Sequence, residues 1–219
     1  MITLVGNLKG GCGKSTIAFN LAVWLAHGGH KVVAFDLDPQ ATLSDASEVR
    51  REEEVSPTLR VFRPDSNPMQ ILKDFQEGEV LIDVGASNLW AMRQAIGMAD
   101  RIVIPVPPSQ ADVWSTQRFL DITRETVAAK QKAKPELILF VNRADTHPGL
   151  KETSETYEVL KTIGGVRVLP CKIGQRTAYR RSFSEGRAVF ELAPGSKAAD
   201  EFLMLATELF PAPGMAMAG

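Results

Sequence analysis

The chain has 219 residues, 44% of them hydrophobic and 23% charged, with 25 lysines and arginines against 26 aspartates and glutamates. This composition excludes a disordered or collagen-like chain. The formal net charge of −1 excludes a protein that is basic overall, so any binding of nucleic acid must depend on a local basic patch.

Short apolar segments alternate with helical patterns along most of the chain. Most of the apolar segments are continuous in valine, isoleucine, leucine and phenylalanine, which is typical of strands covered on both faces. Such alternation indicates βαβ units. We therefore predict an α/β fold with a doubly wound, mostly parallel sheet and helices on both faces. The predicted strands are 2–5, 31–35, 59–62, 80–84, 101–106, 137–141 and 166–169. The predicted helices are 14–27, 68–76, 88–98, 111–132, 151–162, 175–185 and 196–210.

The domain organisation is simple, because no linker or internal repeat separates these elements. We predict one domain over residues 1–210 and a flexible tail over 211–219, where proline, glycine and small residues cannot build a packed face. The mixed-charge run Glu48–Glu54 is the second stretch that we expect to be mobile. The two cysteines, Cys12 and Cys171, form no CxxC pair and fit a reducing cytoplasm.

The first predicted strand leads into a glycine-rich segment that opens the first predicted helix. Glycines there let the backbone wrap a polyphosphate, with N–H groups and the helix N-terminus facing the anion. Lys14 is expected to reach the β- and γ-phosphates, and the Ser15 hydroxyl to bind Mg²⁺. A strict Walker A pattern would have glycine in place of Leu8, whereas a dinucleotide fingerprint fails at Thr16. The segment predicts a P-loop and consists of Lys9, Gly10, Gly11, Cys12, Gly13, Lys14, Ser15 and Thr16.

Three aspartates follow predicted strands. Asp83 comes after the fourth strand and is the Walker B candidate, which holds Mg²⁺ through water. Asp36 and Asp38 end the second strand, and the two-residue period of a strand predicts that both face the phosphate site. Any one of these aspartates alone could cap a helix. Together with the P-loop, they predict a magnesium-dependent phosphate site.

With Lys9 before the double glycine, the P-loop is a deviant Walker A motif. Together with Asp36-Leu37-Asp38-Pro39-Gln40 it resembles the ParA/MinD group of ATPases, specifically the short ParA-like partition and cargo-positioning proteins. Further matches are Pro105–Trp114, Asn142-Arg143 and Arg176–Lys197. The resemblance implies a P-loop ATPase that uses ATP and Mg²⁺ and hydrolyses ATP slowly within an ATP-sandwiched homodimer.

The resemblance also implies roles at the phosphates. Lys9 would cross the dimer interface and contact the phosphates bound to the partner subunit, as a cationic finger does. Lys14 would act within its own subunit, and Asp38 would orient the attacking water. The segment Asp83-Val84-Gly85 would form the second switch, although it lacks the Asp-x-Pro-Pro form of some relatives.

The metal and the base are assigned in the same way. Ser15, Asp36 and Asp83 would hold or support Mg²⁺. Asn142 would contact the adenine edge, and the chain around Pro170 would close over the base.

Other P-loop functions remain open at this point. The segment Asn142–Asp145 also resembles the guanine-reading NKxD pattern, so GTP is an alternative, although Lys9 and the Asp38-Pro39-Gln40 context favour ATP. A metabolic ligase or kinase, a GTP-dependent targeting or metal-insertion factor, and a module that only senses ATP are further alternatives. The missing His/Cys clusters argue against metal insertion.

Residues 167–187 carry six basic residues and one acidic residue, Glu185. Such a cluster suits contact with DNA phosphates, which requires positive charge without base reading. The alternatives are a solvated face or contacts to nucleotide or to a dimer partner. ParA-like relatives bind DNA nonspecifically when ATP-bound, so the resemblance favours DNA and nucleoid association. The DNA-binding candidates are Lys172, Arg176, Arg180 and Arg181.

The remaining partner predictions concern proteins and membranes. The resemblance implies an adaptor or partition partner that stimulates hydrolysis. A membrane partner is not expected, because the last predicted helix has an acidic polar side that an anionic membrane would repel. With no signal-peptide pattern and no apolar run of membrane-spanning length, we expect a cytoplasmic protein.

Overall fold

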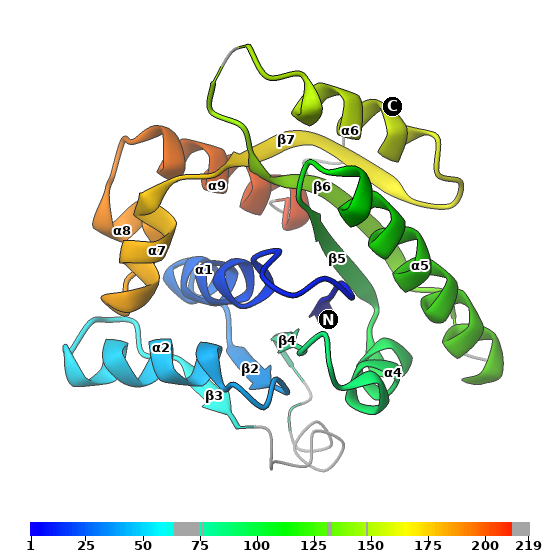
Figure 1. The fold of residues 1–219 in the computed structure, drawn as a ribbon. Coiled ribbons are helices and arrows are strands. Elements are labelled where there is room, and N and C mark those ends of the chain that lie inside the picture. Colours follow the sequence, from blue (N-terminus) through cyan, green and yellow to red (C-terminus); the bar gives the residue numbers. More distant parts are fainter. Residues whose placement is uncertain (64–74, 76, 131–132, 148, 212–219) are drawn as a thin grey trace.

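A parallel sheet of seven strands runs through the computed structural model, which describes residues 1–63, 75, 77–130, 133–147 and 149–211 (Figure 1). The strand order is β3-β2-β4-β1-β5-β6-β7, and every neighbouring pair is parallel. The strands are β1 Ile2–Val5, β2 Val32–Asp36, β3 Arg60–Phe62, β4 Glu79–Asp83, β5 Arg101–Val106, β6 Glu136–Ala144 and β7 Arg167–Gly174.

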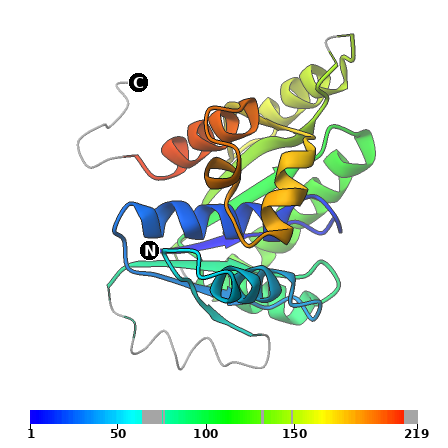
Figure 2. The same ribbon diagram turned by 90° about the vertical axis from the view of Figure 1, so that its left-hand side faces the viewer.

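Helices cover both faces of this sheet (Figure 1). Helices α1, α2, α7, α8 and α9 lie on one face, where α1 runs between α9 and α2 (Figure 2). Helices α4, α5 and α6 lie on the other face (Figure 1). The predicted doubly wound α/β fold is therefore confirmed. The helices are α1 Lys14–His27, α2 Thr42–Glu52, α4 Leu89–Met98, α5 Gln110–Lys130, α6 Glu152–Lys161, α7 Thr177–Ser184, α8 Val189–Leu192 and α9 Lys197–Leu209.

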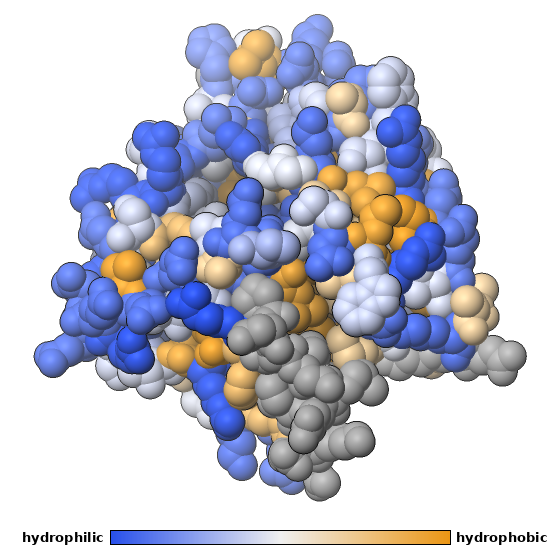
Figure 3. All heavy atoms as spheres, turned by 60° about the horizontal axis from the view of Figure 1, so that its bottom comes forward, coloured by the Kyte–Doolittle hydropathy of each residue, from blue (hydrophilic) through white to orange (hydrophobic). Residues whose placement is uncertain are grey.

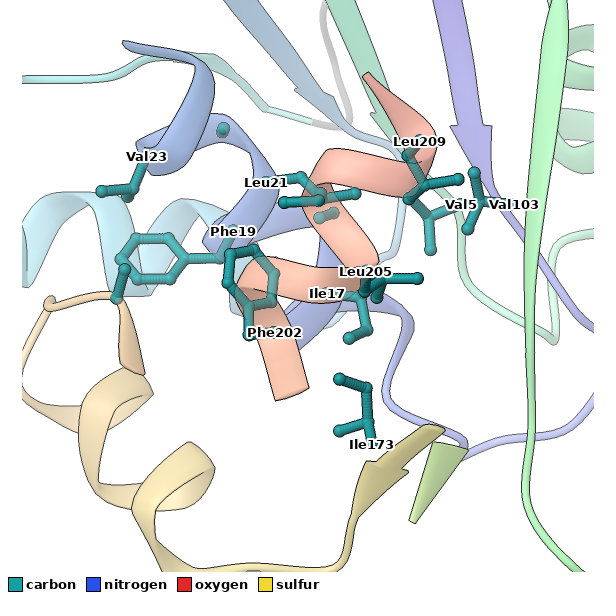
Figure 4. Packing of buried hydrophobic residues seen from close by; sticks show 14 of the residues in the cluster. Val5, Ile17, Phe19, Leu21, Val23, Val103, Ile173, Phe202, Leu205 and Leu209 are labelled. Atoms are coloured by element: carbon teal, nitrogen blue, oxygen red, sulfur yellow. The ribbon is translucent and has the colours of Figure 1, made fainter. Parts of the chain in front are cut away.

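The strands are continuous in apolar residues because both sheet faces are buried. In β1, Leu4 joins the core under α4 and α5, whereas its neighbour Val5 joins the core under α1 and α9. Figure 4 shows the second of these cores, where Leu205 of α9 lies next to Ile17 of α1, and Phe202 of α9 lies on the side of Phe19. Full burial of such a side chain contributes about 1.5–3 kcal/mol. Packing of α1 between the sheet and α9 thereby fixes the position of α1 and of the loop before it.

Strand β7 is longer than predicted. Its inward residues Leu169, Cys171 and Ile173 are buried, whereas Pro170 and Lys172 between them are exposed. This alternation is that of an edge strand with one solvated face, so a search for continuous apolar residues ends too early. The helix that follows begins at Thr177 rather than at Gln175.

The prediction that Glu48–Glu54 is mobile is wrong. Most of this run belongs to α2, which was not predicted, and Arg50 within it is completely buried. The Arg50 guanidinium pairs with both carboxylate oxygens of Glu191, at 2.7 and 2.8 Å, and also donates to the carbonyl oxygens of Pro57 and Gly186. The charge of Arg50 therefore holds helix α2 in place through buried hydrogen bonds, whereas the sequence suggested a solvated loop.

Two other predicted segments lie outside the described residues. These are the helix over 68–76, apart from Phe75, and the tail beyond Pro211. The short helix α8 was not predicted, because its four residues are too few to show a helical period.

Candidate nucleotide site

Three functional segments meet because the strands before them are neighbours in the sheet. Strand β4 lies between β2 and β1, and its last residue, Asp83, pairs in register with Asp36 on one side and with Val5 on the other. The P-loop, the segment after β2 and the segment after β4 therefore leave the sheet at one place along its carboxyl edge. Open α/β sheets bind their ligands in such positions.

The P-loop has the conformation that its glycines permit. Gly11 and Gly13 have φ angles of 73° and 96°, in the left-handed region that favours glycine. A β-carbon at residue 13 would come within 2.4 Å of the Asn142 side-chain nitrogen. Within the described part of the chain, the N–H groups of Gly10, Gly11 and Gly13 donate no hydrogen bond. These donors precede the N-terminus of α1, where an anion is electrostatically favoured.

The two lysines of the P-loop differ in environment. Lys14 is buried, and its Nζ donates to the carbonyl oxygen of Lys9 at 3.0 Å. The Lys9 side chain is exposed. Lys14 thus lies inside the P-loop, whereas the Lys9 side chain is open to solvent.

Asp83 is the strongest indication of a metal. It is completely buried, and neither carboxylate oxygen has a hydrogen-bond partner of normal geometry. Burial raises the pKa of Asp83 to about 7, against the lowering effects of the nearby Ser15 hydroxyl and the Lys14 charge. A buried carboxylate without a partner beside a hydroxyl fits Mg²⁺, which is commonly held by one or two carboxylates together with phosphate oxygens and water.

Asp36 was predicted to face the phosphate site, but it lines neither cavity over the P-loop. Its two carboxylate oxygens accept hydrogen bonds from the backbone N–H groups of Ser44, at 2.8 Å, and Asp38, at 3.2 Å. Burial raises the pKa of Asp36, and these hydrogen bonds oppose the rise. The strand ends at Asp36, so the two-residue period does not extend to Asp38. Asp36 therefore holds the turn that carries Asp38 and leads into α2.

Two adjoining cavities extend over the P-loop. The cavity of 420 Å³ lies at the expected phosphate position, and Lys14, Ser15 and Asp38 are among the residues that line it. The cavity of 480 Å³ lies between the P-loop, the end of β7 and α7. Their volumes lie within the range of small-molecule pockets. Sequence reasoning did not identify Thr42 or Phe183 as site residues. The residues that line both cavities are Gly11, Gly13, Thr16, Thr42 and Phe183.

The two segments predicted to contact the base differ in position. Asn142 lines the second cavity, but its side-chain nitrogen donates to the carbonyl oxygen of Cys12 at 2.6 Å. Pro170 lines neither cavity and is exposed within β7, so its predicted placement over the base is corrected. Because β7 continues to Gly174, the cavity wall is built by residues 173–177 instead.

The arrangement around Asp145 does not favour guanine recognition. Its backbone N–H donates to the Thr153 hydroxyl at 3.0 Å, and its carboxylate lies 3.4 Å from the same hydroxyl. Asp145 lines a separate cavity next to α6, not the one between the P-loop and α7.

The predicted DNA-binding residues fall into two groups. Arg176 pairs with Glu201 through two hydrogen bonds of 2.5 and 3.0 Å and lines the second cavity. Arg181 pairs with Glu185 at 3.3 Å. The charge count over residues 167–187 did not include Glu201, which lies on α9 and contacts Arg176 in the folded chain. The described residues provide no ion-pair partner for the other two candidates, the exposed Lys172 and Arg180.

Among the described residues, no helix has the length and hydropathy needed to cross a bilayer.

Comparisons with known proteins agree with this geometry. The profile of the CobQ/CobB/MinD/ParA nucleotide binding domain matches residues 3–189. The chain is 32% identical over 211 residues to the maintenance of carboxysome distribution protein A of Halothiobacillus neapolitanus, covering 94% of this chain and 95% of that protein. It is 28% identical to the protein ParA of Rhizobium radiobacter, covering 84% and 83%. The structure of apo McdA from Cyanothece has a similar fold, with a TM-score of 0.77 at 19% identity and coverage of 95% and 98%.

Proposed function

The chain belongs to the CobQ/CobB/MinD/ParA nucleotide-binding family, whose ParA/MinD-type members are ATPases, and from this premise we propose its cellular role. We propose that it binds Mg·ATP, forms an ATP-dependent homodimer, hydrolyses ATP slowly and binds nonspecific DNA in the dimeric state. Its purpose is to partition a plasmid or chromosome, or to position a cellular cargo over the nucleoid.

The observation that carries the ATPase site is the buried, unpartnered Asp83 beneath the P-loop. Ser15 and Asp83 are the residues that would hold Mg²⁺, which when bound offsets phosphate charge and orients the oxygens of the triphosphate. The P-loop N–H groups and Lys14 bind the phosphates, and Asp38 lies in the same cavity to orient the attacking water. Asp36 supports this step through its hydrogen bond to the backbone of Asp38.

The dimer is supported by charge and by exposed apolar side chains near the site. Lys9 is exposed at the P-loop, where a cation can contact phosphates in a second subunit. Trp90 in the first turn of α4 and Trp114 in the first turns of α5 are 74% and 55% exposed. Both helices begin after the carboxyl ends of strands, β4 and β5, at the edge of the sheet that carries the site. Apolar side chains also gather on the mostly hydrophilic face in Figure 3. A second subunit would remove such side chains from water.

DNA binding is proposed for a narrower set of cations than the sequence indicates. Lys172 and Arg180 are exposed and carry charge that no described acidic residue offsets, so they can contact phosphates. Arg181 contributes less because Glu185 lies beside it, and Arg176 is excluded because Glu201 neutralises it. The names of the relatives support partitioning of chromosomes and distribution of carboxysomes as the two kinds of task. For either task we propose an adaptor partner that stimulates hydrolysis.

The test is cosedimentation with DNA in the presence of ATP, ADP or no nucleotide, at two salt concentrations, together with light scattering. We expect dimers and DNA retention only with Mg·ATP, with retention weakened at the higher salt concentration. If nucleotide binds but no dimers form, the proposed dimer is rejected and the proposed nucleotide site stands. Equal retention with ADP and ATP would reject the nucleotide-dependent DNA function.

A further inference from the structure

Arg143 has an unusual backbone and an unusual partner. It directly follows Asn142, near the end of β6, and has a φ angle of 57°. This is the left-handed region, where a residue with a β-carbon is disfavoured. Its side chain is exposed, yet the guanidinium Nη1 donates to the carbonyl oxygen of Gly11 at 2.5 Å. A disfavoured backbone conformation thus places an exposed cation against the P-loop.

Arg143 and Asn142 hold two successive carbonyl groups of the P-loop. Asn142 donates to the carbonyl oxygen of Cys12 at 2.6 Å, and Arg143 to that of Gly11. In a trans peptide unit the carbonyl group and the following N–H group point in opposite directions. With the carbonyl oxygens of Gly11 and Cys12 fixed toward β6, the N–H groups of Cys12 and Gly13 are directed to the opposite side of the loop.

The consequence for phosphate binding follows from the cavities. The P-loop glycines line the phosphate cavity on one side and the cavity next to Asn142 and Arg143 on the other. N–H groups that are already oriented cost less free energy to order when an anion binds. A residue that holds the carbonyl groups therefore strengthens phosphate binding without contacting the phosphates.

We propose that Arg143 is a positioning residue of the P-loop, which fixes the Gly11 carbonyl group so that the backbone amides face the nucleotide phosphates. The inference rests on the proposed nucleotide binding. It assigns to Arg143 no contact with the base and no contact with DNA. The left-handed backbone is retained because it delivers the guanidinium to this carbonyl group, since strained backbone persists at sites that need the resulting geometry.

The experiment measures affinity and thermal stability together, by titration calorimetry with Mg·ATP, Mg·ADP and Mg·GTP and by thermal unfolding without nucleotide. We expect Arg143→Gln to bind each nucleotide that the wild type binds about 5- to 10-fold more weakly, which is within the range for loss of one ordinary hydrogen bond, because Arg143 acts through the loop and not on the nucleotide. Arg143→Lys, which keeps one N–H donor on a cation, should recover part of this affinity. Arg143→Gly removes the guanidinium and also the left-handed strain, so it should lose affinity while its melting temperature is unchanged or higher.

The matched control is Arg124→Gln. Arg124 is also an exposed arginine that donates to a glycine carbonyl group, that of Gly164 at 3.0 Å, but it lies on α5 outside both cavities. We expect its nucleotide affinity to equal that of the wild type. A wild-type protein that binds no nucleotide would reject the proposed function itself. If the wild type binds nucleotide and the Arg143→Gly variant binds it with equal affinity, only the positioning role is overturned. A loss confined to ATP, with the GTP affinity unchanged, would also overturn it and indicate direct contact with the base.

Discussion

The Asp38 carboxylate lies against the α-carbon of Gly85, so that a β-carbon at residue 85 would come within 2.8 Å of the carboxylate carbon. The contact links the segment after β2 to the segment after β4. Asp38 is the residue proposed to orient the attacking water, so its position depends on residue 85 having no side chain. Its Oδ1 also accepts a hydrogen bond from the Gln40 N–H at 3.0 Å, which fixes the carboxylate from the other side.

Gly85→Ala is therefore expected to impair turnover more than binding. The added methyl group displaces the Asp38 carboxylate, and a small displacement of a catalytic group costs about 10- to 100-fold in kcat. ATP affinity should stay near the wild-type value, because the P-loop and Lys14 are unaffected. Steady-state phosphate release and calorimetry separate the two effects. Gly164→Ala is the control, since a β-carbon there meets no atom within 4 Å. Equal loss in both variants would contradict the prediction.

The two P-loop lysines should separate binding from dimerisation. Lys14→Ala is expected to weaken nucleotide binding by about 10- to 100-fold, because it removes a charged donor from the phosphates. Lys9→Ala should retain affinity, since Lys14 bonds to the Lys9 backbone and not to its side chain. It should nevertheless fail to form ATP-dependent dimers. Light scattering with Mg·ATP measures this, and a Lys9→Ala variant that dimerises like the wild type would remove the role of Lys9 between subunits.

Asp83→Asn should stabilise the nucleotide-free protein while abolishing function. The amide keeps the size of the side chain and removes an unpartnered buried charge, which proteins tolerate poorly. We expect a higher melting temperature at pH 8 without nucleotide, and loss of magnesium-dependent ATP hydrolysis. Thermal unfolding and a phosphate assay check the two effects. Retained magnesium dependence in this variant would exclude Asp83 as the metal-binding carboxylate.

The revised DNA surface is tested by charge reversal. The double variant Lys172→Glu/Arg180→Glu should lose DNA retention at saturating Mg·ATP and reduce the salt dependence of any remaining binding by about 1 in log K per log salt for each lost phosphate contact. The control is Arg118→Glu/Lys134→Glu, which makes the same charge change at exposed positions elsewhere. Because Arg180 lines the second cavity, ATP affinity is measured first. If the double variant retains DNA as the wild type does, the DNA surface lies elsewhere.

Glu191→Gln is expected to destabilise the fold in a pH-dependent manner. Burial alone would raise the pKa of Glu191, but hydrogen bonds from Arg50, His27 and the Ala188 N–H outweigh burial and hold this pKa below its ordinary value of 4.5. A lowered carboxyl pKa stabilises the folded protein above the pKa of the unfolded chain, and this stabilisation disappears as the pH falls through the folded-state pKa.

The variant should lose about 3 kcal/mol at pH 7, since Arg50 is then left buried with a weaker partner. The difference from the wild type should shrink below about pH 4. Urea unfolding across this pH range measures both. Glu185→Gln is the control, because its exposed pair with Arg181 contributes at most about 0.5 kcal/mol. A Glu191→Gln variant as stable as this control would contradict the prediction.

The sheet and the P-loop could be predicted because their signals are local. Continuous apolar residues revealed the buried strands, and the glycines before Lys14 revealed the loop. The partners of charged residues could not be predicted, because they lie far away in the sequence. Glu191 is 141 residues from Arg50, and Glu201 is 25 residues from Arg176. The first pair holds residues that were expected to be mobile within helix α2. Because of the second pair, Arg176 is not part of the proposed DNA surface.

Thr42 and Phe183, which border both cavities, come from helices α2 and α7. These helices are 125 residues or more apart along the chain. A ligand that contacts both residues would therefore link an early part of the polypeptide to a late one. Some proteolytic cleavage requires α7 to separate from α2. Such cleavage should become slower as the nucleotide concentration rises, because nucleotide binds the form in which the two helices are together and lowers the fraction of molecules in which they are apart. The protein would thus report occupancy of its pocket as resistance to digestion.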